Sequence, residues 1–433
     1  MSAAIIPTPT PQIGLKALRA IIRERSVMAA LPVMRDELGD IFRVNAPGFN
    51  PVMLSGPEAC RWVLVEQRDN LLWRMETDPI TQLLSHGILV EDGPTHDDAR
   101  RQLQPAMHKG MIESYVDAMV RCTDRVLDSW PDGSRQDLLV EVRKMALLIL
   151  LDTLFDVDHR PDMPPLWNPL LKMVDFISPG LWLFWSGVPR PGYKRAIAQW
   201  DAYFAGMIAK RRAELDADPS RDDMLSLMIR SGFSEANIRD QMMTMLIAGH
   251  DTITALLAWA FHLLGQHSDV RQRCVAEIDS VLGTGTPTAD SLAGLTYLRQ
   301  VVDETLRLYP PAHLGSRKAA LDLLFRDYVI PKGTRVVYSI FLTQRDARYW
   351  PDPNRFDPER FAPGTTIAPY TFLPFGGGKR NCIGSYFAQI EARVIIARVL
   401  QRFDLSAGPA HPHMHMGATI EPRPGVPLTV RRR

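Results

Sequence analysis

The sequence predicts a mainly α-helical protein with small β-sheets, in one domain covering residues 1–433. Several long segments are apolar with a helical period and contain no proline, whereas the runs that suggest strands are short and bounded by glycine or proline. No internal repeat, low-complexity block or linker divides the chain. The clearest helical segments are Ser234–His267, Tyr297–Leu308 and Ser385–Leu400.

Composition points to a soluble protein of the cytoplasm. Hydrophobic residues make up 46% of the chain and charged residues 23%, and a net charge of +1 predicts no bulk attraction to nucleic acid or anionic membrane. The four cysteines are too widely spaced for a zinc site and suit a reducing compartment. The segment Met242–Leu264 could span a bilayer, but His250 and Asp251 interrupt it. We expect a buried helix there and no transmembrane anchor.

In chain order, residues 11–45 are expected to be helical, and two strands should surround the turn at Pro47-Gly48. Residues 70–94 contain glycine and proline breaks and predict a long loop. Helices are expected over residues 112–154 and 193–215. Further on, Phe325–Ile330 and Thr334–Ile340 predict two short strands.

The segment 164–191 between two predicted helices is rich in proline and aromatic residues. These side chains fit a plain core, a roof over a ligand cavity, or a peripheral membrane contact near residues 176–188. The alternating histidines at 411–415 could suggest a metal site, but a polar hairpin is favoured because no fourth ligand is evident. The aromatic residues of the first segment include Trp167, Phe176, Trp182, Phe184 and Trp185.

One cysteine stands in a glycine-rich loop directly before a predicted helix. Three consecutive glycines precede Cys382, and the helix is predicted to start at Ser385. Glycines let the backbone pass close to a bulky group. A helix N-terminus favours an anion, so this position is expected to lower the pKa of the thiol and to favour a thiolate ligand.

The pattern Phe-x-x-Gly-x-Arg-x-Cys-x-Gly, met by Phe375, Gly378, Arg380, Cys382 and Gly384, resembles the haem-binding loop of the cytochrome P450 family. The resemblance spans roughly residues 90–425 through five ordered landmarks. It implies the cytochrome P450 fold, an α-rich triangular prism, and haem b (iron protoporphyrin IX) as cofactor. It also implies that the Cys382 thiolate is the axial ligand of the iron.

A polar interruption of the long apolar helix matches a second family landmark. Ala248-Gly249-His250-Asp251-Thr252 resembles the segment that crosses the haem face opposite the cysteine. The resemblance implies that Ala248 and Gly249 leave room for dioxygen, and that Asp251 and Thr252 supply protons for its activation. If the resemblance is set aside, the same residues also fit a close contact between two helices.

The remaining landmarks imply haem contacts and a buried ion-pair network. His96 and Arg100, four residues apart, resemble the family's pair for a haem carboxylate, although a solvated basic turn has the same spacing. Arg317 is a further candidate, as are Phe375, Arg380 and Gly384 of the loop. Glu304 and Arg307 resemble the family's structural pair, which Arg360 completes. Residues expected to line the substrate cavity are Leu246, Ile247, Ala248, Ala312, His313, Leu314, Ala418 and Thr419.

The function implied is a monooxygenase that hydroxylates or epoxidises an apolar small molecule with O2 and two electrons. The substrate is expected to be terpenoid, carotenoid-like or fatty acyl. No nucleotide-binding glycine motif or iron–sulfur cysteine array is evident in the sequence, so we expect a separate electron donor, a ferredoxin with its reductase or a flavodoxin-type protein, docking on the cysteine side. Two alternatives stay open: a peroxide-driven peroxygenase of the same fold, and a noncatalytic haem sensor or carrier. The expected docking residues are Arg101, Lys109, Lys379 and Arg393.

Overall fold

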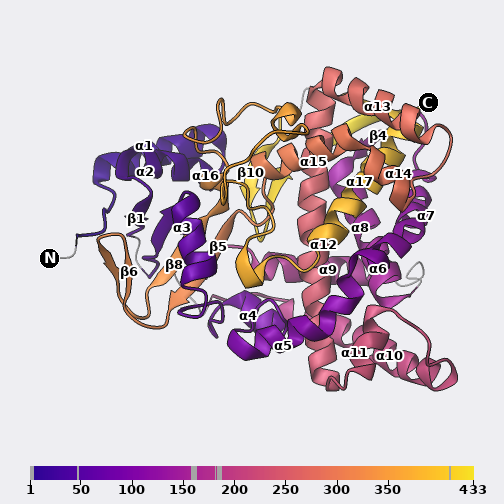
Figure 1. Cartoon of the computed structure of the whole chain (residues 1–433), viewed down its shortest axis with the longest axis horizontal. Helices are drawn as coiled ribbons and strands as arrows, with labels where there is room; N and C mark the ends of the chain where they lie inside the picture. The colour runs from indigo at the N-terminus through magenta and orange to yellow at the C-terminus, as the bar shows by residue number, and fades with distance from the viewer. Residues whose placement is uncertain (1–3, 46–47, 158–162, 181, 183–187, 409–410) are drawn as a thin grey trace.

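The computed structural model describes residues 4–45, 48–157, 163–180, 182, 188–408 and 411–433. Figure 1 shows a helical part arranged around α12 and a smaller part near the N-terminus that contains a sheet. The helices are α1 (Pro11–Glu24), α2 (Ala30–Leu38), α3 (Pro57–Arg61), α4 (Pro79–Leu84), α5 (Gly93–Leu103), α6 (Lys109–Ser114), α7 (Val116–Leu127), α8 (Leu138–Phe155), α9 (Met163–Ile177), α10 (Tyr193–Ala217), α11 (Met224–Arg230), α12 (Glu235–Gln266), α13 (Ser268–Leu282), α14 (Ala289–Gly294), α15 (Thr296–Leu308), α16 (Ile340–Thr343) and α17 (Ser385–Arg402).

The strands form a mixed sheet, a three-stranded sheet and two hairpins. The mixed sheet has the order β1-β2-β8-β5-β3, with β2 and β8 parallel, and the three-stranded sheet has the order β4-β12-β9. The hairpins are β6-β7 and β10-β11. The strands are β1 (Ile41–Arg43), β2 (Val52–Ser55), β3 (Leu71–Leu72), β4 (Arg135–Asp137), β5 (Leu314–Ala319), β6 (Leu323–Phe325), β7 (Tyr328–Ile330), β8 (Arg335–Ser339), β9 (Phe403–Ala407), β10 (His413–Met416), β11 (Ile420–Arg423) and β12 (Pro427–Arg432).

Helix α12 forms the centre of the helical core. The Ser234 side chain caps it by accepting a hydrogen bond from the backbone N–H of Asn237 at 3.2 Å, as the sequence predicts. It packs against α8, α15 and α17. By length and composition α12 could cross a membrane, but 83% of its most apolar window is buried inside the protein. The expectation of a buried helix is therefore confirmed.

Two local predictions were wrong. The expected loop at residues 70–94 contains β3 and α4, because Pro79 starts a helix whose Leu83 and Leu84 are fully buried against the core. The expected strand Phe325–Ile330 is interrupted by a turn: Phe325 ends β6, Arg326 takes a positive φ of 51°, and Tyr328–Ile330 forms the antiparallel partner β7.

The described part of the proline- and aromatic-rich segment connects α9 to α10. Phe176 is buried and stacks on Tyr193 with ring centroids 3.3 Å apart. The indole N–H of Trp182 donates to the Ser178 carbonyl oxygen at 2.7 Å. The Ser178 hydroxyl accepts a hydrogen bond from the N–H of Ala418 at 3.0 Å. The start of this connection therefore rests on the turn between β10 and β11, while Phe184 and Trp185 lie outside the described residues.

Candidate functional site

The glycine-rich loop closes on itself directly before α17. The N–H of Cys382 donates to the Phe375 carbonyl oxygen at 2.8 Å, and α17 begins three residues later. Gly376 and Gly378 have φ values of 71° and 64°. A Cβ on Gly378 would lie 2.5 Å from the Leu64 carbonyl oxygen, so only glycine fits there. The close approach is thus to the neighbouring backbone near Leu64.

The predicted lowering of the Cys382 thiol pKa was wrong in sign. Burial among protein atoms raises the pKa above its ordinary value, and this effect outweighs the hydrogen bond from the Gly384 N–H and the charge of Arg100, which both lower it. The Cys382 side chain nevertheless keeps accessible surface. Cys382 is thus closely surrounded by protein and still keeps surface that a ligand can reach.

Three arginines and one histidine gather beside this loop from three separate parts of the chain; burial lowers the pKa of His96, which favours its neutral form. His96 and Arg317 are buried on α5 and β5. The Arg100 guanidinium donates to the backbone and side-chain oxygens of Asn381 at 2.7 and 2.9 Å. Burial and the nearby charge of Arg317 lower the pKa of Arg380 to about 10.

Acidic groups balance only part of this positive charge. Asp92 accepts from Arg380 at 3.1 Å, and Asp97 accepts from His96 at 2.8 Å. In the described part of the chain, Arg317 has no carboxylate partner; its guanidinium donates to the Ser316 carbonyl oxygen at 2.8 Å. Buried cations need counter-charges. The surplus therefore fits a ligand with carboxylates beside Cys382, and haem carries two.

The middle of α12 differs in exposure from the buried turns on either side of it. Ala248, Gly249 and Thr252 keep accessible surface within an otherwise buried stretch. A Cβ on Gly249 would lie 2.7 Å from Leu150 of α8, so this glycine also permits the helix–helix contact that the spacing allowed. The Thr252 hydroxyl donates to the Ala248 carbonyl oxygen at 2.6 Å, which leaves its oxygen free to accept.

Asp251 lies at the junction of α12 and β11. Its Oδ2 accepts a hydrogen bond from the Thr419 hydroxyl at 2.9 Å, and its Oδ1 has no partner among the described residues. Burial and the charge of Glu421 raise the pKa of Asp251 to about 7, although Thr419 and the arginines Arg143 and Arg423 oppose the shift. Glu421 is itself held by both arginines. The Arg423 side chain is 40% exposed, so this cluster reaches from Asp251 to the surface.

The ionic network expected from the sequence is assembled in the structure. The Arg307 guanidinium donates to both carboxylate oxygens of Glu304 at 2.6 and 2.8 Å, and both side chains are fully buried. Arg360 lies 3.5 Å from the same carboxylate. Arg307 also donates to the carbonyl oxygens of Gln344 and Pro353. The pair therefore joins α15 to the two loops that follow α16.

The expected cavity residues are dispersed over three elements. Leu246 and Ile247 are buried in α12, whereas Ala312, Leu314 and Ala418 keep accessible surface. Burial lowers the pKa of His313 to about 4, so its ring is neutral at physiological pH. Thr419 is committed to Asp251 rather than open to a ligand.

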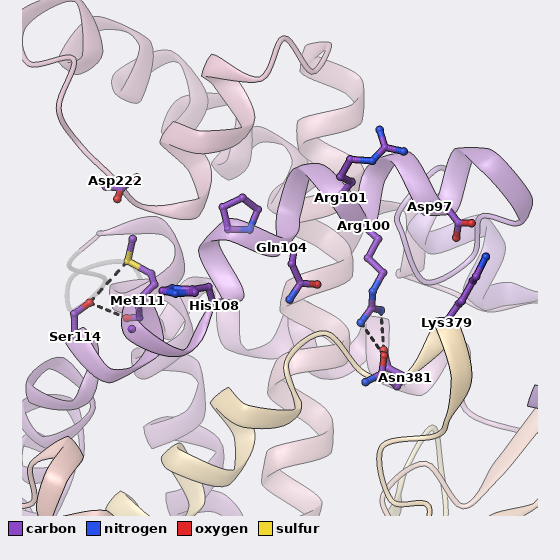
Figure 2. Close-up of a pocket in the computed structure, with 12 residues that line it drawn as sticks. Asp97, Arg100, Arg101, Gln104, His108, Met111, Ser114, Asp222, Lys379 and Asn381 are labelled. Carbon is purple, nitrogen blue, oxygen red and sulfur yellow. Dashed lines mark hydrogen bonds between the residues drawn. The ribbon is translucent and has the colours of Figure 1, made fainter.

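A surface hollow of about 1020 Å³ lies on the cysteine side of the molecule. Figure 2 shows Arg100 reaching to Asn381, while Arg101 points away from it and Lys379 stands nearby. Asp251 and Thr252 do not line this hollow. Arg393, expected on this surface, is instead buried and donates to the Leu292 carbonyl oxygen, which corrects that prediction.

Sequence reasoning missed Asp92, Arg143, Asn381 and Glu421. Asp92 could have been suspected because it precedes Gly93-Pro94, a helix start. The Arg143–Glu421 pair joins positions 278 residues apart, so no local pattern marks it.

Comparisons with known proteins agree with this geometry. The family model described as Cytochrome P450 matches residues 7–425. "Cyclooctat-9-en-7-ol 5-monooxygenase" of Streptomyces melanosporofaciens is 30% identical, covering 89% of this chain and 86% of that protein. "Putative cytochrome P450 120" of Synechocystis is also 30% identical, covering 92% and 90%. The solved structure "Retinoic acid bound cyanobacterial CYP120A1" has a TM-score of 0.85 at 26% identity and covers 100% of both chains.

These findings confirm the mainly α fold with small sheets. The chain belongs to the cytochrome P450 family of haem-thiolate monooxygenases, oxidoreductases that use O2, electrons from redox partners and a small-molecule substrate.

Proposed function

We propose that this cytochrome P450 hydroxylates or epoxidises a neutral isoprenoid-like molecule, with electrons from a separate ferredoxin or flavodoxin-type donor. The main support is that one relative is named for the monooxygenation of an alcohol, cyclooctat-9-en-7-ol, and that the solved neighbour is described as bound to retinoic acid, an isoprenoid. The proposed cavity residues are mostly small or aliphatic, and His313 is neutral. None of them is a cation that would select an acid.

Titration of the haem-loaded protein with matched ligands tests the substrate class. Retinol and retinoic acid share one carbon skeleton and differ in charge, so they separate apolar fit from acid recognition. We expect the neutral ligand to give the larger low-spin to high-spin shift at equal concentration. A stronger response to the acid, or no response to terpenoid alcohols, would contradict the proposed substrate.

Bound haem supplies the activation of O2, and this chain supplies the ligand, the charge balance and the protons. We assign the Cys382 sulfur to the iron, and His96, Arg100, Arg317 and Arg380 to the haem carboxylates. Phe375, Gly384, Ala248 and Gly249 then line the cofactor.

Protons are proposed to come from Asp251 at Oδ1, the atom that no described residue satisfies. The Thr252 hydroxyl donates its own hydrogen bond to the Ala248 carbonyl oxygen, so its oxygen could accept a hydrogen bond from the protonated Asp251 carboxyl. A group with a pKa of about 7 both holds and releases a proton at physiological pH. Thr419 fixes the position of the carboxyl.

Asp251→Asn is expected to lower product formed per electron consumed by about 100-fold, because amides do not donate protons as acids do. In the wild type, this coupling should fall as pH rises through about 7, where the carboxyl loses its proton. Thr419→Val should lower product formed per electron consumed roughly tenfold. Thr419→Ser, which keeps the hydroxyl, should retain the wild-type coupling. Product, peroxide and reductant are measured together; equal coupling in Asp251→Asn and wild type would remove the proton role.

The donor is proposed to dock over the hollow beside Asn381, which adjoins Cys382. Exposed Arg101, Lys109 and Lys379 surround this surface. In the described part of the chain Lys379 has no ion-pair partner, whereas Arg101 pairs with Asp98 at 2.7 Å. An acidic donor would therefore gain most from Lys379.

Lys379→Glu is expected to slow reduction by an acidic ferredoxin about tenfold at low salt, with the difference shrinking as salt rises. Lys332→Glu, an equally exposed lysine on another face, is the matched control and should reduce at the wild-type rate. Stopped-flow absorbance measures both. Reduction rates insensitive to salt in every variant would argue against docking on this surface.

The cytoplasm is the proposed compartment. Cys60, Cys122 and Cys274 are buried free thiols, and burial raises the pKa of each to about 12. Such unpaired thiols suit a reducing environment.

A further inference from the structure

Exposed large apolar side chains are concentrated at the N-terminal end of the molecule. In the described part of the chain, eight of the twelve such residues lie at positions 5–27 and 321–329. Figure 1 shows α1 and the β6-β7 hairpin at this same end of the long axis. A concentration of this kind marks a contact surface, whereas isolated exposed apolar residues do not. The eight are Ile5, Leu15, Leu18, Ile22, Val27, Leu321, Leu324 and Val329.

Helix α1 has a buried side, an exposed apolar side and an exposed basic side. Its buried residues are Ala17 and Ala20, which face the protein. At about 100° per residue, Leu15, Leu18 and Ile22 fall within about 60° of one another on a different side. They are 49%, 50% and 69% exposed. The helix thus has an outward apolar stripe that no described part of the chain covers.

A basic stripe runs along one flank of this apolar stripe. Lys16, Arg19 and Arg23 lie within about 60° of one another, beginning about 40° from Leu15. With Arg25 at the C-cap, α1 carries four cations, of which Lys16 pairs with Glu37 of α2 at 2.5 Å and Arg23 with Glu24 at 2.8 Å. Arg19 and Arg25 are exposed and have no ion-pair partner among the described residues.

The hairpin extends the apolar surface. Leu324 and Val329 are cross-strand partners on the outward face, 63% and 42% exposed, while Leu323 and Phe325 point into the core. The N–H of Ala4 donates to the Asp327 carbonyl oxygen at 2.9 Å, which places Ile5, 91% exposed, beside them. Exposing two aliphatic side chains to water is unfavourable, so their outward position favours a contact surface.

We infer that the apolar stripe of α1 and the outward face of the β6-β7 hairpin bind the surface of an anionic lipid bilayer. Apolar side chains enter the acyl boundary, and the long basic side chains extend to the lipid phosphates, as in interfacial amphipathic helices. The attraction is local, because the whole chain carries only +1. This surface is not the membrane contact that the sequence suggested near residues 176–188, where Phe176 is buried.

The charge of α1 indicates whether this surface binds lipid or a second copy of the chain. Two copies meeting through α1 would bring together Arg19 and Arg25 of both copies, unpaired in the part of the chain that the structure describes, and Glu24, the acidic residue of α1, is already paired with Arg23. An anionic bilayer instead attracts basic side chains that lie near its surface. The basic flank therefore favours lipid.

The test is flotation of the haem-loaded full chain with vesicles of phosphatidylglycerol and phosphatidylcholine in equal parts. Wild type is expected to float at low salt and to bind vesicles of phosphatidylcholine alone much more weakly. The variant L15Q/L18Q/I22Q keeps good helix formers and should bind roughly tenfold or more weakly. R19Q/R23Q should lose most of the salt dependence.

V140Q/V281Q, which alters similarly exposed residues on α8 and α13, is the matched control and should float as wild type does. Circular dichroism and the reduced, CO-bound spectrum show that each variant is folded. The inference is overturned if wild type does not float with anionic vesicles, or if L15Q/L18Q/I22Q floats equally well. It is also overturned if light scattering finds a wild-type dimer that L15Q/L18Q/I22Q dissociates without any vesicle binding. None of these outcomes depends on the proposed substrate.

Discussion

Replacing Cys382 by serine is expected to abolish the red-shifted absorption of the reduced, CO-bound protein together with monooxygenase activity. A serine hydroxyl stays protonated at neutral pH, so it cannot supply the thiolate that donates electron density to the iron. We expect the activity loss to exceed the roughly 100-fold typical of changing a group that only supports a metal ligand. Optical spectra of the purified protein under CO measure the first effect and product formation the second.

Cys274→Ala is the control for this experiment. Cys274 is fully buried in α13, away from the glycine-rich loop. Its variant should keep the wild-type spectrum after correction for haem content. If Cys382→Ser retained the red-shifted absorption, or Cys274→Ala lost it, the ligand assignment would be wrong.

The parts of the fold that depend on local pattern were predictable. The cap at Ser234, the length of α12 and the position of Cys382 before α17 all follow from residues close in sequence. The long loop expected at residues 70–94 was wrong because its proline was taken as a break, although it starts the short helix α4. Proline and glycine thus mark the boundary of an element, but they do not determine whether a loop or a helix comes next.

The parts that depend on burial were not predictable. Helix position alone suggested a lower thiol pKa for Cys382, but desolvation reverses the shift. Arg393 was expected on the surface, yet tertiary packing buries it beneath α14. The bond between Thr419 and Asp251 joins positions 168 residues apart, so the sequence could only suggest Thr419 as a cavity residue. Sequence shows which groups are present, and packing decides their environment.

Arg307→Ala is expected to lower the free energy of unfolding by about 3–5 kcal/mol, the usual cost of removing one partner from a buried ion pair. Glu304, fully buried, would keep only the 2.9 Å hydrogen bond from the Asp357 N–H and the more distant Arg360. Burial raises the pKa of Glu304, and Arg307 opposes that shift. Without Arg307 the carboxyl should therefore be neutralised more readily, so the variant should lose less stability at acidic pH and more as pH rises through the raised pKa.

Urea unfolding of the haem-loaded protein from pH 5 to 8 measures this dependence. Arg355→Ala is a matched control, because Arg355 lies in the loop that accepts from Arg307 but its own side chain is exposed and pairs with Asp357 at the surface. It should leave the unfolding midpoint nearly unchanged, since exposed ion pairs contribute little. If the two variants lost equal free energy of unfolding, the buried pair would contribute no more to stability than the exposed one. A loss for Arg307→Ala that does not change with pH would mean that Glu304 stays ionised, held by Arg360 and the backbone instead.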